Sequence, residues 1–211
     1  MTRRGTYAVG RARREQILDV ATAKFATQGY SRTSMARIAR DVGLTGPGLT
    51  HHFPTKTHLL VAVAERRFDL INEWAATTEG DPLRQMVRMA HMFAAQPGLI
   101  ELFVLVSAEA ADPTSAAHSL YVDRYERVVA ALVASFRHGV ESGHLRADVD
   151  YEAVARECIA VADGLQLQWV ITGGTIDLPA LIRGHLERLA PAILTSGETP
   201  DLAPVSEWGR E

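Results

Sequence analysis

The sequence predicts an all-α protein of about nine helices, with a three-helix N-terminal domain and a larger helical domain behind it. Apolar residues recur along the chain at the three- and four-residue spacing of helix faces. Glycine and proline, which stop helices, divide the 211 residues into segments of helical length. No segment alternates apolar and polar residues as a half-buried strand does. These three observations favour helices packed on helices throughout.

Residues 33–56 predict two short helices joined by a tight turn. The first helix has an apolar face made of Met35, Ile38, Ala39 and Val42. Gly43 follows where a left-handed residue would end that helix, because glycine takes positive φ without a steric penalty. The second helix buries Leu49 and Phe53, and Pro54 ends it. This pattern is typical of a helix-turn-helix, which lays its second helix in the major groove of DNA.

The outer side of this motif supplies the expected DNA contacts. Thr33 and Thr45 are expected to cap the two helices, where free backbone N–H groups bind phosphates. Gly46 and Gly48 have no side chain, so base readout falls to the polar residues after them or to close backbone approach. Capping without DNA also explains each threonine taken alone. The full expected set is Thr33, Ser34, Thr45, Gly46, Gly48, Thr50, His51, His52 and Lys56.

About twenty positions agree in order and spacing with one known family: Asp19, Val20, Ala21, Lys24, Phe25, Gly29, Tyr30, Thr33, Ile38, Ala39, Val42, Gly43, Leu44, His51, Phe53, Pro54, Lys56, Leu59 and Leu60. Residues 11–65 therefore resemble the N-terminal domain of TetR-type (tetracycline-repressor-like) bacterial transcriptional regulators. The resemblance implies a homodimer on operator DNA, joined by a four-helix bundle, with a small molecule held among helices four to seven. This chain departs from the family at Gly46–Gly48, where larger residues are usual, and at Thr50 and His52, where aromatics are usual. We therefore expect fewer base contacts than is usual in the family, with more weight on DNA shape and on the basic arm.

The net charge of -3 conceals a strong asymmetry along the chain. Residues 1–60 hold ten Lys or Arg against three acids, a balance of +7, whereas the remainder has a balance of -10. A basic N-terminal region followed by an acidic remainder is typical of a protein that binds the phosphates of a nucleic acid at one end. The alternative is a solvated basic surface, but its coincidence with a helix-turn-helix favours DNA.

The predicted domains are a flexible basic arm over residues 1–10, a DNA-binding domain over 11–56, an effector-binding and dimerisation domain over 57–194, and a tail over 195–211. The helix before the motif is expected at about 11–28. The helices after it are expected at about 56–79, 82–96, 97–112, 114–142, 150–172 and 178–194. Pro191 should kink the last of these or end it early. Leu202 and Trp208 in the tail are candidates for docking on the body.

The last two helices are expected to form the dimer interface. The segment from Cys158 to Ile171 is apolar nearly all round, so it must be covered on more than one side. Two seams with helical spacing contain the expected contact residues Val154, Cys158, Val161, Leu165, Ile182 and Leu189. The alternative is a helix buried deep inside a monomer.

A small apolar or amphipathic effector is expected in the body. Methionine adapts to irregular apolar ligands, and several methionines lie near aromatics at helical spacing. The expected lining residues are Trp74, Met89, Met92, Phe93 and Phe103. The alternative is that they form an ordinary packed core. The leading hypothesis is accordingly a ligand-responsive repressor that binds a palindromic operator, and the alternative is a constitutive DNA binder without effector.

Other classes of function find no support in the sequence. There is no triad arrangement, phosphate loop, zinc spacing or dinucleotide fingerprint, so we expect neither an enzyme nor a bound cofactor. His51 and His52 point about 100° apart on a helix and cannot share a metal ion. Cys158 is the only cysteine and is expected as a small buried hydrophobe. No apolar run reaches membrane-spanning length, so we expect a cytoplasmic protein.

Overall fold

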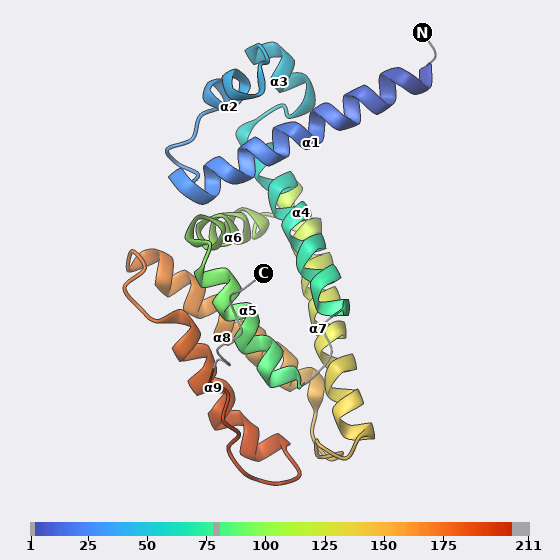
Figure 1. The fold of residues 1–211 in the computed structure, drawn as a ribbon, viewed down its shortest axis with the longest axis vertical. Helices are drawn as coiled ribbons and strands as arrows, with labels where there is room; N and C mark the ends of the chain where they lie inside the picture. The colour runs from blue at the N-terminus through green and yellow to red at the C-terminus, as the bar shows by residue number, and fades with distance from the viewer. Residues whose placement is uncertain (1–2, 78–80, 204–211) are drawn as a thin grey trace. The chain divides into compact units, whose positions relative to one another are not determined.

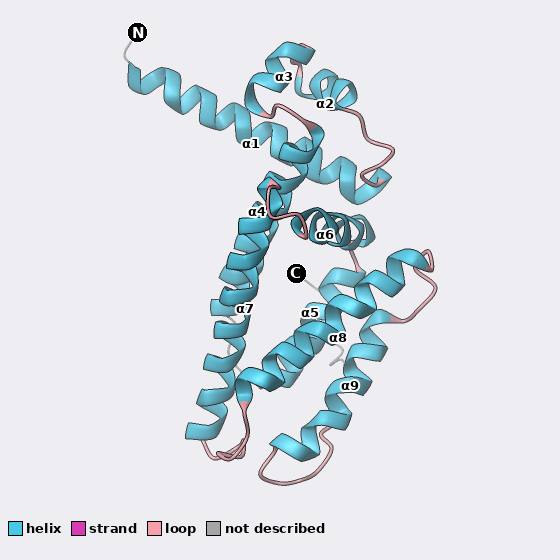
Figure 2. Ribbon diagram, turned by 180° about the vertical axis from the view of Figure 1, so that it is seen from behind, coloured by secondary structure: helices cyan, strands magenta, loops and turns pink. Residues whose placement is uncertain are grey.

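The structure is a computed structural model that describes residues 3–77 and 81–203, and side chains over 9–70, 81–96 and 98–203. Within these residues the chain forms nine α-helices and no strand (Figures 1 and 2). They are α1 (Arg3–Gln28), α2 (Met35–Val42), α3 (Gly46–His52), α4 (Lys56–Thr77), α5 (Pro82–Ala94), α6 (Pro97–Ala110), α7 (Ala116–Glu141), α8 (Tyr151–Ile171) and α9 (Leu178–Ile193). The expected all-α class is confirmed.

Local sequence signals explain where most helices begin and end. Asp81 caps α5 by accepting a hydrogen bond from the backbone N–H of Leu83, and Asp150 caps α8 in the same way. Pro191 lies in the last turns of α9, and the helix runs through it to Ile193. The tail residue Leu202 is fully buried, as expected for docking, whereas Trp208 lies outside the described residues.

The first helix is longer than the sequence suggested. It begins at Arg3 rather than near Arg11, so residues 3–10, expected as a flexible arm, are helical. No proline interrupts this stretch, and Gly5 and Gly10 weaken a helix without ending it. In Figure 1 the N-terminal part of α1 runs past α2 and α3.

The chain divides into two compact units, which are described separately. The first holds residues 1–70 and 97–121, and the second holds residues 71–96 and 122–211. The first unit thus contains α1–α3, most of α4, α6 and the start of α7. The second contains α5, most of α7, α8 and α9.

The first unit is built around the inner faces of its short helices. In Figure 1, α2 and α3 lie on one side of α1 and α6 lies on the other. Its core consists of side chains that are at most 1% exposed: Ile17, Phe25, Ile38, Leu49, Phe53 and Leu59. An ion pair between Lys24 and Asp41 joins α1 to α2. Arg66 joins α4 to α1 through Asp19 Oδ1 at 2.7 Å and Thr22 Oγ1 at 2.9 Å.

The second unit packs α5 and α8 against α9. The helices meet through Leu83 and Val87 of α5 and Leu186 of α9, all of which are fully or almost fully buried. Cys158 of α8 is 6% exposed, and burial raises the pKa of its thiol to about 11. The expectation of a buried, unpaired cysteine is confirmed.

No single helix in the described part of the chain is long and apolar enough to cross a membrane. One bent pair, Pro82–Ala94 with Gly98–Ala110, reaches that length and hydropathy only when its two helices are counted together.

The contact between α6 and the end of α1 requires a glycine. A Cβ added at Gly98 would lie 2.3 Å from the carbonyl oxygen of Phe25 and 2.4 Å from that of Ala26. Both neighbours are backbone atoms, so no side chain can rotate away to make room. The two helices can therefore approach this closely only because residue 98 lacks a side chain.

We expect Gly98→Ala to lower the free energy of unfolding by about 1–3 kcal/mol, because overpacking forces the two backbones apart. Gly10→Ala is the matched control, since nothing lies within 4 Å of a Cβ added at this other helical glycine. In a helix the control should gain up to about 1 kcal/mol. Chemical denaturation monitored by circular dichroism measures both. Equal stability of the two variants would contradict the close approach.

Candidate functional site

The α2–turn–α3 motif is held by caps at three of its four ends. Ser34 Oγ accepts a hydrogen bond from the N–H of Arg37, and Thr45 Oγ1 accepts one from the N–H of Gly48 at 3.2 Å. Gly43 has φ 72° and ψ 35°, the left-handed conformation expected from the sequence. Its N–H and that of Leu44 donate to the last carbonyls of α2. The turn is thereby fixed by backbone hydrogen bonds.

The outer side of α3 is open to solvent. Leu49 and Phe53 point inward and are at most 1% exposed. The exposed residues are Thr45, Gly46, Pro47, Thr50 and His51, while Gly48 and His52 are partly covered. The structure therefore gathers seven of the nine expected contact residues, exposed Ser34 among them, at the motif's accessible surface. The remaining two, Thr33 and Lys56, behave differently.

Thr33 was expected as the cap of α2, and this was wrong. The cap is Ser34, one residue later. Thr33 is 1% exposed, and its hydroxyl donates to the Gly29 carbonyl at 3.0 Å. Its N–H is also used, since it donates to the Tyr30 carbonyl at 3.1 Å. Both polar groups of Thr33 thus fasten the turn after α1, and its side chain offers DNA nothing.

Lys56 is partly committed to the fold. Its Nζ donates to the Tyr30 carbonyl at 2.6 Å and lies 3.9 Å from the centre of the Tyr30 ring. Burial lowers the pKa of this ammonium, and the nearby Glu101 carboxylate opposes that effect. The ammonium has three N–H donors, so it retains capacity for a phosphate.

Two arginines of α1 hold the motif. Arg13 donates to the Val42 carbonyl and Arg14 to the His52 carbonyl, each at 3.4 Å. The Arg14 guanidinium also lies 4.3 Å from the centre of the Phe53 ring. Positive charge at these helix C-termini is favourable because the last carbonyls carry partial negative charge.

The surroundings of His52 favour its neutral form. Burial, followed by the neighbouring charges of His51 and Arg14, lowers the pKa of His52. A neutral imidazole offers one donor and one acceptor. His52 can thus hydrogen bond to a base edge without carrying a charge.

The expected effector residues do not form one described site. Met89, Met92 and Phe93 are partly exposed on α5 in the second unit, whereas Phe103 belongs to the first. Phe103 packs there with Phe68 and Tyr121, whose ring centres are 6.3 and 5.7 Å away. Trp74 lies on α4, but its side chain is outside the described residues. This grouping stays a prediction.

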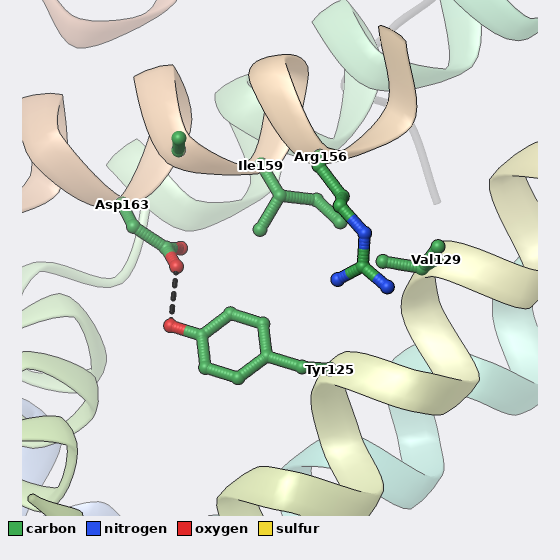
Figure 3. Close-up of a pocket in the computed structure, with 6 residues that line it drawn as sticks. Tyr125, Val129, Arg156, Ile159 and Asp163 are labelled. Carbon is green, nitrogen blue, oxygen red and sulfur yellow. Dashed lines mark hydrogen bonds between the residues drawn. The ribbon is translucent and has the colours of Figure 1, made fainter. Parts of the chain in front are cut away.

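The second unit contains a cavity of about 390 Å³ between α7 and α8 that the sequence did not predict. It is lined by Tyr125, Val129, Arg156, Ile159, Ala160 and Asp163 (Figure 3). Figure 3 shows the Tyr125 hydroxyl pointing at Asp163, to which it donates at 2.7 Å. Burial raises the pKa of Asp163 and outweighs the opposing effect of Arg124, which lies 3.7 Å away. The one sequence feature that could have indicated this cavity is Asp163, an acidic residue within the apolar segment of α8.

The dimer residues expected on α8 and α9 differ in their exposure in the single chain. Val154, Cys158 and Ile182 are 6–8% exposed, because they pack inside the chain's own core. The large apolar side chains left exposed on these helices are Leu167 at 45%, Ile171 at 74% and Leu181 at 44%. The other expected contacts, Val161, Leu165 and Leu189, are partly exposed. Which of these side chains meets a second copy of the chain stays a prediction.

The capped motif and its open outer face define a helix-turn-helix transcriptional regulator with a helical body. The family model for bacterial regulatory proteins of the tetR family matches residues 17–63, and that for the C-terminal domain of BetI-type transcriptional repressors matches residues 81–193. The chain belongs to the TetR family of bacterial regulatory proteins. The expected class, a ligand-responsive DNA-binding regulator, is confirmed at the level of the family.

Individual relatives agree with this membership. The chain is 27% identical to the HTH-type transcriptional repressor KstR2 of Rhodococcus jostii, over 82% of this chain and 87% of the relative. It is 25% identical to a transcriptional regulator from Saccharomonospora viridis solved with choline, with a TM-score of 0.69 over 86% of this chain and 97% of that one. A TetR regulator from Haloarcula marismortui has the same fold, with a TM-score of 0.72 at 24% identity over 87% of this chain and 99% of that one.

The Tyr125–Asp163 hydrogen bond should contribute measurably to stability. We expect Tyr125→Phe to cost about 1.5–3 kcal/mol, because the lost donor serves a buried carboxylate. The pKa of Asp163 should also rise further, since this hydrogen bond favours the ionised form. Tyr151→Phe is the control: its hydroxyl donates at 2.7 Å to the exposed carbonyl of Arg146 and should be worth about 0.5–1.5 kcal/mol. Urea denaturation compares the two, and an equal loss would argue against a special role for the buried pair.

Proposed function

We propose that this regulator is a repressor that binds a palindromic operator as a homodimer and leaves it when a small molecule binds. The observation that carries the proposal is the solvent-exposed outer side of α3, fixed from beneath by buried Leu49 and Phe53. The relatives in Rhodococcus jostii and Mycobacterium tuberculosis are named transcriptional repressors. Because such a protein acts on the bacterial chromosome, its proposed location is the cytoplasm.

Two kinds of DNA contact are proposed. Thr50 and His51 are exposed on α3 and are proposed to read base edges, with His52 beside them. Gly46 and Gly48 allow the backbone of α3 to approach the groove closely. Ser34, Thr45 and Lys56 are proposed to bind phosphates, which fix the position of the protein but carry no sequence information.

The proposed dimer interface is the outer side of α8 and α9 around Leu167, Ile171 and Leu181. Exposed side chains of this size on two adjacent helices are favourable only when another surface covers them. A second copy of the chain provides a self-complementary surface. Pairing would present two α3 helices to half-sites roughly 34–36 Å apart, one turn of DNA.

The proposed effector is small and apolar or amphipathic. The regulator from Saccharomonospora viridis, at 25% identity, was solved with choline, so bodies of this type hold small organic molecules. Trp74, Met89, Met92, Phe93 and Phe103 are the proposed lining. A constitutive DNA binder is the alternative, and a thermal shift against small-molecule libraries separates the two, because only a real site gives stabilisation that grows with ligand concentration.

Operator binding should depend on Thr50 and His51 in a base-specific way. After selection of the operator from random duplexes, Thr50→Ala and His51→Ala should each cost about 1–3 kcal/mol at particular base pairs. Lys56→Ala should weaken binding to all sequences alike and reduce the salt slope by about one. Thr27→Ala is the control, since this exposed hydroxyl only donates to the Ala23 carbonyl of α1. Fluorescence anisotropy at several salt concentrations measures all four. Unchanged operator affinity in the Thr50 and His51 variants would show that α3 does not read the DNA.

The dimer should come apart when a charge is placed on the α8 face. Ile171 is 74% exposed in the single chain, so Ile171→Glu leaves the fold intact and buries an unpaired carboxylate only in the dimer. Val9→Glu is the matched control, because Val9 is 69% exposed on α1. Analytical ultracentrifugation should show a monomer for the first and a dimer for the second. An Ile171→Glu variant that stays dimeric would move the interface elsewhere.

A further inference from the structure

One arginine on α4, Arg67, is partly exposed as a residue but has two buried guanidinium nitrogens. The Nε and Nη2 atoms of Arg67 are inaccessible to solvent and make no hydrogen bond in the described part of the chain. The preceding residue behaves in the opposite way, because Arg66 is bound to Asp19 at 2.7 Å and to Thr22 at 2.9 Å. Arg183 also has a buried Nε without a hydrogen bond, but Glu187 lies 3.7 Å from it. Among these guanidinium groups, Arg67 alone lacks a carboxylate within reach.

Two apolar side chains lie on the face of α4 that carries Arg67. Val63 and Ala64, one turn earlier on the same face of α4, are 0% exposed. Burial is the cause that lowers the pKa of the Arg67 guanidinium. A charge removed from water is costly unless a partner compensates it, and arginine stays protonated rather than losing its charge. An anion that the described part of the chain does not supply would compensate these two buried donors.

The chemistry of the side chain limits what that anion can be. A guanidinium presents a planar fork of donors that matches a carboxylate or a phosphate with two parallel hydrogen bonds. The apolar face beside it has no affinity for a hydrated inorganic ion, so the anion should carry an apolar portion. The neighbouring residue, Phe68, packs against the rings of Phe103 and Tyr121, and the Tyr121 hydroxyl donates to the Phe103 carbonyl at 2.6 Å. These rings make the neighbouring side of α4 apolar.

We propose that Arg67 binds the anionic head group of an amphipathic effector, so that the small molecule recognised by this regulator is an organic acid or a phosphate ester with an apolar body. The inference rests on the proposed ligand response and names its ligand class. The position on α4 gives it a route to function, because this helix begins at Lys56 directly after the DNA-binding motif. A ligand held at Arg67 therefore acts on the helix that directly follows α3 in the chain.

Four probes with the same decyl chain and different head groups distinguish recognition of the head group from recognition of the chain. Decanoate and decyl phosphate carry the two candidate anions, decanol is neutral, and decyltrimethylammonium is cationic. We expect the melting temperature of the full-length protein to rise with concentration of at least one anion and not with decanol or the cation. Which anion gives the larger rise tells a carboxylate from a phosphate ligand.

Two neighbouring substitutions test the role of the guanidinium. Arg67→Met keeps the aliphatic packing and should weaken binding of the effective anion roughly ten- to a hundredfold, the loss expected for charge-assisted hydrogen bonds. Without ligand, this variant should melt no lower than the wild type, because it removes an unpaired buried charge. Arg66→Met is the matched control: it should melt lower, because its ion pair is lost, and should keep the response to the anion.

Three results would overturn the inference. These are stabilisation by decanol equal to that by both anions, an unchanged anion response in Arg67→Met, or a ligand-free Arg67→Met that melts well below the wild type. Operator binding by the wild type, measured in parallel, distinguishes a failure of the Arg67 assignment from a failure of the proposed function. Binding without an anion response defeats only the assignment of Arg67, whereas loss of specific DNA binding defeats the proposed function.

Discussion

The DNA-reading surface of this protein depends on burial of the inner faces of α2 and α3 against α1. Helices of eight and seven residues are too short to be stable alone in water. Ile38, Leu49 and Phe53 supply the missing stability by packing into the same core as Phe25. The outer residues of α3 are thereby left free to vary, because none of them is needed to hold the helix. This separation explains how glycine, proline and histidine can occupy the outer face without loss of the fold.

The positive charges of residues 1–60 stabilise the fold and are not all available to DNA. Arg13 and Arg14 point at the carbonyl ends of α2 and α3, and Lys24 pairs with Asp41. Lys56 is held at the Tyr30 carbonyl. The +7 balance of residues 1–60 therefore overstates the number of cations available to phosphates. The salt dependence of binding should reflect mainly the exposed arginines and the residual capacity of Lys56.

The sequence was most informative where local chemistry decides the conformation. Gly43, Thr45 and Asp81 were assigned correctly because turn and cap preferences act within a few residues. Thr33 and Ser34 have equivalent hydroxyls, so only the packing of Thr33 under Gly29 shows which of them caps α2. Helix α8 posed a different problem. Its apolar residues run nearly all round, so their spacing could not show that Cys158 faces the chain's own core while Ile171 faces outward.

The remaining features depend on tertiary contacts that no local pattern encodes. The close approach at Gly98 depends on where the end of α1 lies, and the cavity beside Asp163 depends on the packing of α7 on α8. Arg67 and Arg66 look alike in the sequence, and only their positions around α4 separate a group bonded to Asp19 from one with two buried, unbonded nitrogens. Such contrasts between adjacent residues arise because neighbours on a helix point about 100° apart.

The burial of Cys158 has a practical consequence for spectroscopy. Its thiol is almost wholly inaccessible, and a pKa of about 11 leaves a negligible fraction as the reactive thiolate near neutral pH. A second cysteine introduced at an exposed position such as Thr27 would therefore take a maleimide dye or spin label selectively, with the native cysteine left in place. Distances between the labels on the two chains of the proposed dimer would then report the separation of their DNA-binding domains. The interior of the protein would stay unmodified.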